Sequence, residues 1–251
     1  MLATDLCGPA RPALAFARQI ARRRSVPVRA VHVLDLSGEA GPPSFTAAHS
    51  SAERALRAIR RELRTAGIEN AATLVSAGKP AAALAELVQQ HQPSLLILGL
   101  CGTSRAPAAI GTTARPLLAD PPCPILTVND RCPESPAPDS LAAVVIVVDS
   151  FQESLRTALA IWPLDPRQPP PTVLAVQPDA PRTRRAPAAS PHREIPLNPA
   201  QAAKEVLRHA ARSGLVIAAF RSGSPLASLT PGSLAHTLLT QAPCPVLTLR
   251  A

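Results

Sequence analysis

A seven-residue segment occurs twice in the chain, and this repeat limits the folds open to it more than any other feature. Residues 122–128 read PCPILTV and residues 243–249 read PCPVLTL, with the cysteine and both prolines in register. In a chain of 251 residues such a match indicates internal duplication. We therefore expect two copies of one domain, each of an ordinary domain size.

The first half alternates strand patterns with helix patterns. Apolar runs predict strands at residues 1–5, 26–35, 71–78, 94–100 and 124–128. Helical periodicity lies between them. The first helix is indicated by an apolar stripe at Ala13, Phe16, Ala17 and Ile20. The second, at residues 45–66, has its stripe at Ala52, Leu56, Ile59 and Leu63 and is expected to end at Gly67. A third is expected at residues 79–92, and a short fourth from residue 112. Five strands that alternate with helices indicate an α/β fold with a mainly parallel five-stranded sheet covered by helices on both faces.

The second half repeats this order in a shortened form. Strands are expected at residues 142–149, 171–177, 192–198, 215–220 and 245–249. Helices are expected through Leu155, Leu159 and Trp162, at residues 199–214, and from Ser233. The interval from Asp5 to Gly111 is 23 residues longer than the interval from Asp149 to Gly232, which matches the loss of the helix at 45–66. A segment rich in proline and arginine, residues 178–194, stands in its place and is expected to be a flexible crossover. The predicted domains are residues 1–130 and 142–251, joined by a linker at 131–141.

Composition excludes several classes of protein. No apolar run reaches the length of a membrane helix, and the first residues lack the pattern of a signal peptide, so we expect a cytoplasmic location and no membrane partner. Five cysteines without a paired spacing favour reduced thiols over disulfides or a metal site. The net charge of +9 comes from arginines scattered over helices without interleaved aromatic residues, which makes nucleic acid an unlikely partner.

The loop at residues 99–113, GLCGTSRAPAAIGTT, carries the strongest indication of a ligand site. Ligands of open parallel sheets bind beyond the carboxyl ends of the strands, where Asp5, residues 33–35 and this loop are all expected. Glycines let the backbone approach a ligand, and a helix start with hydroxyls suits phosphate. The alternative is that Asp5 and Thr112 are helix caps and that the glycines only turn the chain.

Taken in order, the ATD and VHVLD segments, the glycine loop and the closing PCPILTV resemble the universal stress protein family. The resemblance extends over both halves and implies Rossmann-like domains of the adenine nucleotide alpha hydrolase-like type, with ATP and Mg²⁺ bound in one branch of the family. By this resemblance Asp5 and Val33 would contact adenosine, and the ribose and phosphates would lie on Gly99, Gly102, Gly111, Thr112 and Thr113.

The chain departs from the family signature, in which nine residues separate the second glycine from the third. Eight residues separate Gly102 from Gly111, and Cys101 stands where ATP-binding members often have a basic residue, a charge that Arg105 would have to replace. In the second half, Ala219 and Ser222 occupy the first two glycine positions. Side chains there would obstruct phosphates, so the first half is expected to be the copy that binds a ligand.

Two hypotheses of different class follow from these residues. The first is a nucleotide-responsive module that acts through a conformational change or an unidentified protein partner, with no catalytic residues and at most slow ATP hydrolysis. The second is an interaction scaffold of the same fold that binds no nucleotide. Because the last strands of this family commonly pair across a dimer, the resemblance implies such pairing within the chain, and a further homodimer stays open.

Other side chains have simpler interpretations. His32 is expected to be a half-buried strand residue, and Cys123 and Cys244 are expected to be packed side chains. Cys7 and Cys101 are the better candidates for a reactive thiol because they lie near the expected pocket.

Overall fold

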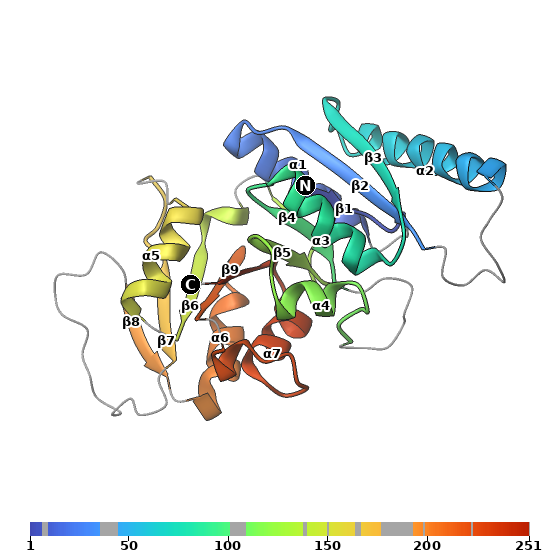
Figure 1. Ribbon diagram of the computed structural model, residues 1–251. Coiled ribbons are helices and arrows are strands. Elements are labelled where there is room, and N and C mark those ends of the chain that lie inside the picture. Colours follow the sequence, from blue (N-terminus) through green and yellow to red (C-terminus); the bar gives the residue numbers. More distant parts are fainter. Residues whose placement is uncertain are drawn as a thin grey trace. The chain divides into compact units, whose positions relative to one another are not determined.

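The computed structural model describes residues 1–6, 10–35, 45–100, 109–137, 140–149, 151–163, 167–176, 193–197, 199–221 and 223–250 (Figure 1). The chain divides into two compact units. The first contains Met1–Cys123 and Glu134–Pro136, and the second contains Pro124–Pro133 and Ala137–Ala251. Both are α/β structures in which helices flank a mainly parallel sheet, as the alternating pattern predicts.

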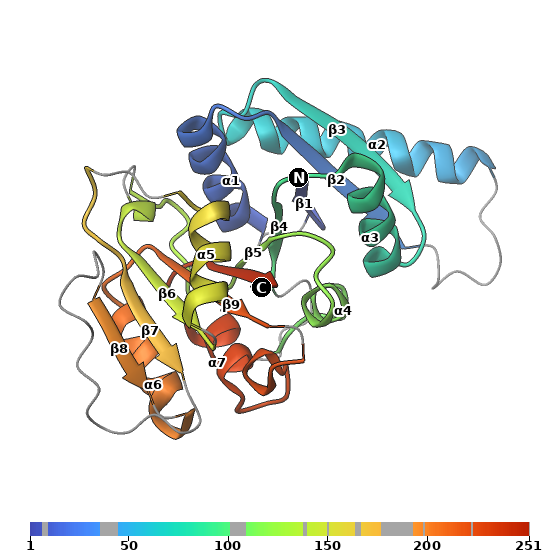
Figure 2. The same cartoon turned by 60° about the vertical axis from the view of Figure 1, so that its left-hand side comes forward.

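The first unit has four parallel strands in the order β3-β2-β1-β4. They are β1 (Leu2–Ala3), β2 (Val28–Leu34), β3 (Ala71–Ala77) and β4 (Leu96–Gly99). Its helices are α1 (Ala10–Arg24), α2 (Phe45–Thr65), α3 (Pro80–His91) and α4 (Ala114–Ala119). Helices α1 and α2 cover one face of the sheet, and α3 and α4 lie on the other, which the two views in Figures 1 and 2 show.

Apolar periodicity explains why these segments form helices. The predicted stripe of α1, from Ala13 to Ile20, is buried at all four positions. In α2 the buried residues are Ala55, Ile59 and Leu63. The remaining two residues of its predicted stripe, at positions 52 and 56, are only half-buried. The continuous apolar run of β4 is buried on both faces, as expected for a strand between two helical layers.

The second unit repeats the strand order of the first. Its parallel strands follow one another as β8-β7-β6-β9-β10, which matches β3-β2-β1-β4 with one further strand. They are β6 (Val144–Val148), β7 (Thr172–Val176), β8 (Arg193–Leu197), β9 (Leu215–Phe220) and β10 (Val246–Arg250). The helices are α5 (Phe151–Ile161), α6 (Pro199–Ala210) and α7 (Leu234–Gln241), with two short 3₁₀ turns, η1 (Ser140–Ala142) and η2 (Pro225–Ala227).

The segment in place of α2 is mostly outside the described residues. Only Arg193 and Glu194 of the predicted crossover are described, and they begin β8. Residues 177–192, which join β7 to β8, lie outside the described residues, so the flexible crossover stays a prediction.

Strand β5 (Ile125–Val128) lies antiparallel to β10 within the second unit. Thr127 is opposite Val246, and the Thr127 hydroxyl donates a hydrogen bond of 3.1 Å to the Val246 carbonyl. The two copies of the repeated segment are thus neighbouring strands. This ladder is why residues 124–133 are grouped with the second unit, whereas the predicted limits at 130 and 142 follow the sequence repeat and stay a prediction.

The search for membrane-spanning segments, restricted to the residues given above, finds no helix that is both long and apolar enough to cross a bilayer.

Candidate functional site

The carboxyl ends of β1, β2 and β4 meet at one edge of the sheet in the first unit. Leu2 pairs with both Ala30 and Ile97, so β1 is the middle strand of the three. Asp5 is the second residue after β1 (Leu2–Ala3), and Val33 is the last residue but one of β2. Gly99 is the last residue of β4 at this edge. Asp5 and Val33, the predicted adenosine residues, therefore both lie at or beside this edge.

The chain turns sharply after β1. The Thr4 amide donates to the Val31 carbonyl at 2.9 Å, and the Leu6 amide donates to the Thr4 hydroxyl at 3.1 Å. Leu6 has a φ of 60°, in the left-handed region. Thr4 is buried whereas Asp5 is exposed, so Asp5 lies at the surface directly after β1.

The ring of His32 fixes this turn from the neighbouring strand. Its Nδ1 lies 2.8 Å from the Thr4 carbonyl oxygen, and because a carbonyl only accepts, Nδ1 carries the proton in this contact. His32 is half-buried, as the sequence predicts for a strand residue. It positions the end of β1.

The second part of the site joins β4 to α4. The Gly111 amide donates to the Leu100 carbonyl at 3.0 Å, which holds residue 111 at the end of β4. Thr112 is exposed, and Thr113 precedes α4 without a side-chain capping bond. The alternative interpretation expects Thr112 to cap this helix. The N-cap residue is instead Thr113, and its hydroxyl makes no capping bond. Because α4 has only six residues, an anion here would be bound by backbone amides and hydroxyls rather than by a helix dipole.

Six of the seven predicted site residues thus lie at or beside the carboxyl edge. The seventh, Gly102, lies outside the described residues, as do Cys101 and Arg105. The arrangement offers an exposed carboxylate, backbone at two glycines and two hydroxyl side chains, which fits the hydroxyl groups of a ribose and the oxygens of phosphate.

The equivalent edge of the second unit is closed by its own residues. Asp149 follows β6, and its side chain is only 5% exposed. Its carboxylate accepts hydrogen bonds from the Arg221 amide at 3.1 and 3.3 Å and from the Ser154 hydroxyl at 3.0 Å. The Arg221 guanidinium lies 4.0 Å away. Sequence reasoning missed this arrangement, because a backbone amide 72 residues away leaves no residue-type signal.

The retained Gly232-Ser233 pair also has a structural role. Gly232 has a φ of 86° in a turn closed by the hydrogen bond from the Ser233 amide to the Thr230 carbonyl. A type II turn with proline before glycine explains this conformation. The Ser233 side chain accepts a hydrogen bond from the His236 amide and caps α7. These two residues are thus accounted for by the fold alone.

Two cysteines of the second unit are buried thiols of high pKa. Burial raises the pKa of Cys132 and of Cys244 to about 12. Burial also raises the pKa of Cys123. Such thiols are protonated and unreactive at neutral pH. Cys7 and Cys101, the candidates for a reactive thiol, lie outside the described residues.

A search of the residues that the structure does describe finds no cluster of His, Cys, Asp and Glu suited to a metal ion.

Comparison with known proteins gives a family match for the first half. The profile of the universal stress protein family matches residues 1–129. A search of curated proteins returned no match.

Solved structures extend the likeness to both halves at the level of fold. A universal stress protein from Archaeoglobus fulgidus DSM 4304 is 18% identical, with a TM-score of 0.66 over 100% of this chain and 95% of that one. A functionally unknown protein from Pseudomonas aeruginosa PAO1 is 12% identical, with a TM-score of 0.52 over 99% of this chain and 92% of that one. At these identities the likeness shows the fold alone.

Proposed function

Because the chain belongs to the universal stress protein family, we propose that it is a tandem, cytoplasmic stress-response module that binds ATP in its first half. The second half, in this proposal, is a degenerate copy with a mainly structural role. Binding changes the conformation of the chain or its affinity for a protein partner, and ATP is not turned over rapidly.

One contrast between the two units carries the proposal. The carboxylate after β1 is exposed beside the ends of β2 and β4, whereas the carboxylate after β6 is buried and hydrogen-bonded to Arg221 and Ser154. Asp149 would have to lose these contacts before it met a ligand, and breaking hydrogen bonds to a buried charge costs free energy. Asp5 in the first unit is exposed, so a ligand can reach its carboxylate from solvent.

The residues present fit a nucleotide in the first unit. Asp5 would accept hydrogen bonds from ribose or adenine, and Val33, half-buried in β2, offers an apolar contact to the base. Gly99 and Gly111 leave backbone accessible to the phosphates, and the hydroxyls of Thr112 and Thr113 would donate to phosphate oxygens. Mg²⁺, when bound with the nucleotide, would neutralise part of the phosphate charge.

The test is ATP binding by the full chain with and without Mg²⁺, measured by calorimetry and by mass spectrometry of any ligand released on denaturation. Asp5→Asn should weaken ATP by about tenfold or more, the usual effect of losing a hydrogen bond to a charged group. Gly111→Val should also weaken binding because its side chain obstructs the backbone. The control is Glu69→Gln, the same change of charge at an exposed residue that precedes β3. Equal ATP affinity of Asp5→Asn and the control would contradict the proposed site.

The interaction scaffold without nucleotide is the second candidate. The eight-residue spacing between Gly102 and Gly111 favours it, because the family signature has nine. No binding of ATP to the unmodified chain and no co-purifying nucleotide would select this candidate. Slow ATP hydrolysis that disappears in Asp5→Ala and Gly111→Val would instead add enzymatic activity to the first proposal.

A further inference from the structure

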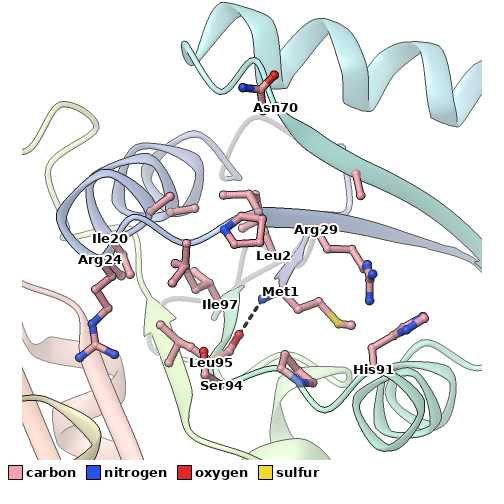
Figure 3. Close-up of a pocket in the computed structure, with 17 residues that line it drawn as sticks. Met1, Leu2, Ile20, Arg24, Arg29, Asn70, His91, Ser94, Leu95 and Ile97 are labelled. Atoms are coloured by element: carbon pink, nitrogen blue, oxygen red, sulfur yellow. Dashed lines mark hydrogen bonds between the residues drawn. The ribbon is translucent and has the colours of Figure 1, made fainter.

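A second cavity lies at the opposite, amino-terminal edge of the first unit's sheet. It has a volume of about 420 Å³ and is bounded by the last turns of α1, the starts of the strands and the loop after α3 (Figure 3). This size is within the usual range for small-molecule sites. Arg29 at this edge and Val33 at the other are four residues apart on β2, which is about 13 Å along the strand. The cavity is therefore separate from the candidate nucleotide site.

Apolar atoms form somewhat more than half of the cavity surface, and polar atoms form the rest. Leu2 and Ile20 are 1% and 4% exposed, and Leu95 and Ile97 are 8% and 5% exposed. Ala21 of α1 adds a small side chain to the same wall. Because these side chains are already almost fully buried, an apolar ligand body here would gain mainly from its own surface, about 25 cal/mol for each Å² removed from water.

The charged side chains that line the cavity are all basic. Arg29 is half-buried at the start of β2, and Figure 3 shows it on the same side of the cavity as His91, with the Met1 thioether between them. None of the 17 lining residues, all within the described part of the chain, is Asp or Glu. Arg24 also lines the cavity, but its guanidinium points away from the Arg29 side.

We propose that this cavity binds an amphipathic organic anion, a carboxylate carried on a short apolar body. A guanidinium beside an apolar wall is suited to hold a carboxylate through two parallel hydrogen bonds while the ligand body lies on the wall. In this arrangement the carboxylate pairs with Arg29, and the apolar body contacts Leu2, Ile20 and Ile97. The volume suits a chain of about ten carbons.

Decanoate is the probe that tests this proposal on the full chain, with calorimetry for affinity and amide chemical shifts for location. Decanol carries the same apolar body without the charge, and acetate carries the charge without the body. We expect decanoate to bind at least tenfold more tightly than either. ATP should leave the affinity for decanoate unchanged, because the two sites are at opposite edges of the sheet.

Three variants locate the site. Arg29→Gln should weaken decanoate at least tenfold by removing the cation, and Ala21→Phe should weaken it by filling the cavity. Arg22→Gln is the matched control for the loss of charge in Arg29→Gln. Arg22 is exposed on α1, the helix of Ala21, and does not line the cavity. Its affinity for decanoate should equal that of the unmodified chain. Thermal unfolding of each variant shows whether the fold is retained.

Three results would overturn the proposal. Equal decanoate affinity in Arg29→Gln and Arg22→Gln would exclude Arg29 as the anion contact. If decanol bound as tightly as decanoate, the carboxylate would contribute nothing to affinity, and the cavity would be a site for neutral apolar molecules. Competition between decanoate and ATP would place the carboxylate at the other edge of the sheet.

Discussion

The amide of Asn129 shows how one side chain joins two elements of the second unit. Its Nδ2 donates to the carbonyls of Leu239 and Ala242, both at 2.9 Å. Its Oδ1 accepts from the Arg131 amide and from the Cys132 thiol. The two carbonyls belong to the end of α7, where helix carbonyls lack partners within the helix. Asn129 therefore connects the end of β5 to the end of α7.

We expect Asn129→Ala to lower the free energy of unfolding by about 2–4 kcal/mol, because two carbonyls and one amide lose their partner in a buried setting. Urea denaturation of the full chain measures this change. The matched control is Asn70→Ala, since Asn70 is an exposed asparagine and should contribute little. An unfolding midpoint for Asn129→Ala equal to that of the control would contradict this account.

The buried thiols give a prediction about alkaline pH. Burial raises the pKa of Cys132 and Cys244 to about 12, above the ordinary value of 9.0. The unfolded chain loses these protons near pH 9 and the folded chain only near pH 12, so stability from this source is complete below pH 9 and is lost as pH rises from 9 to 12. Thermal unfolding at pH 8 to 11 should show a decline that is smaller in Cys132→Ala and Cys244→Ala.

The composition makes this decline measurable. The chain has no Tyr and only two lysines, Lys79 and Lys204. Few other side chains therefore titrate between pH 9 and pH 12. Thiolate absorbance gives a direct titration of the same groups. Titration of all the thiols near pH 9 in the folded chain would contradict the prediction.

At the scale of elements, Gly67 ends α2 in a specific motif. The Ile68 amide donates to the Leu63 carbonyl, and the Gly67 amide donates to the Arg64 carbonyl. Together with a φ of 70° at Gly67, this is a Schellman motif, and Leu63 and Ile68 are both buried beside it. The sequence predicts glycine as the end of this helix, and the prediction is confirmed.

The two glycines at helix boundaries should differ in their tolerance of alanine. A Cβ at Gly67 would lie 3.2 Å from the Arg18 guanidinium, whereas a Cβ at Gly232 would meet nothing within 4 Å. Both positions have positive φ, so each substitution should cost about 1 kcal/mol in backbone strain. We expect Gly67→Ala to cost more than Gly232→Ala because the contact with Arg18 adds to the strain.

A double-mutant cycle tests the added contact. In an Arg18→Ala background the cost of Gly67→Ala, measured by chemical denaturation, should fall toward that of Gly232→Ala. An unchanged cost in that background would show that strain alone determines the effect.

At the scale of the whole molecule, β5 connects the chain's two halves through its ladder with β10. All four residues of β5 are buried, and three register pairs join them to β10. The resemblance implies such pairing of last strands, and the ladder is consistent with that expectation. The strand that closes the first sequence repeat is thus part of the second compact unit.

We therefore expect a chain cut within residues 137–139 to remain associated. A protease site placed there should give two fragments that migrate as one species in size-exclusion chromatography, because the first fragment keeps β5 in the sheet of the second. The same cut in a Leu126→Asp variant should release the fragments, since Leu126 is fully buried opposite Leu247. Release from the unmodified cut chain under native conditions would show that the ladder is too weak to join the two halves.

The order and type of the elements were determined by the sequence alone. Local periodicity predicts, in order, each strand and α-helix that the structure describes, because burial of one helical stripe or of a whole strand depends on neighbours a few residues away. The carboxyl edge as the place for Asp5 and Gly111 also follows from that order. Glycine marks the end of α2 at Gly67 for the same local reason.

Only the tertiary structure decided which distant groups meet. The antiparallel pairing of β5 with β10, the closure of Asp149 by the Arg221 amide, the contacts of Asn129 and the cavity beside Arg29 all join segments far apart in the chain. Backbone amides and carbonyls are the same at every residue, so the sequence cannot mark which of them a side chain will reach. Their positions are fixed when the sheets and helices pack, and this packing leaves one carboxylate exposed and buries the other.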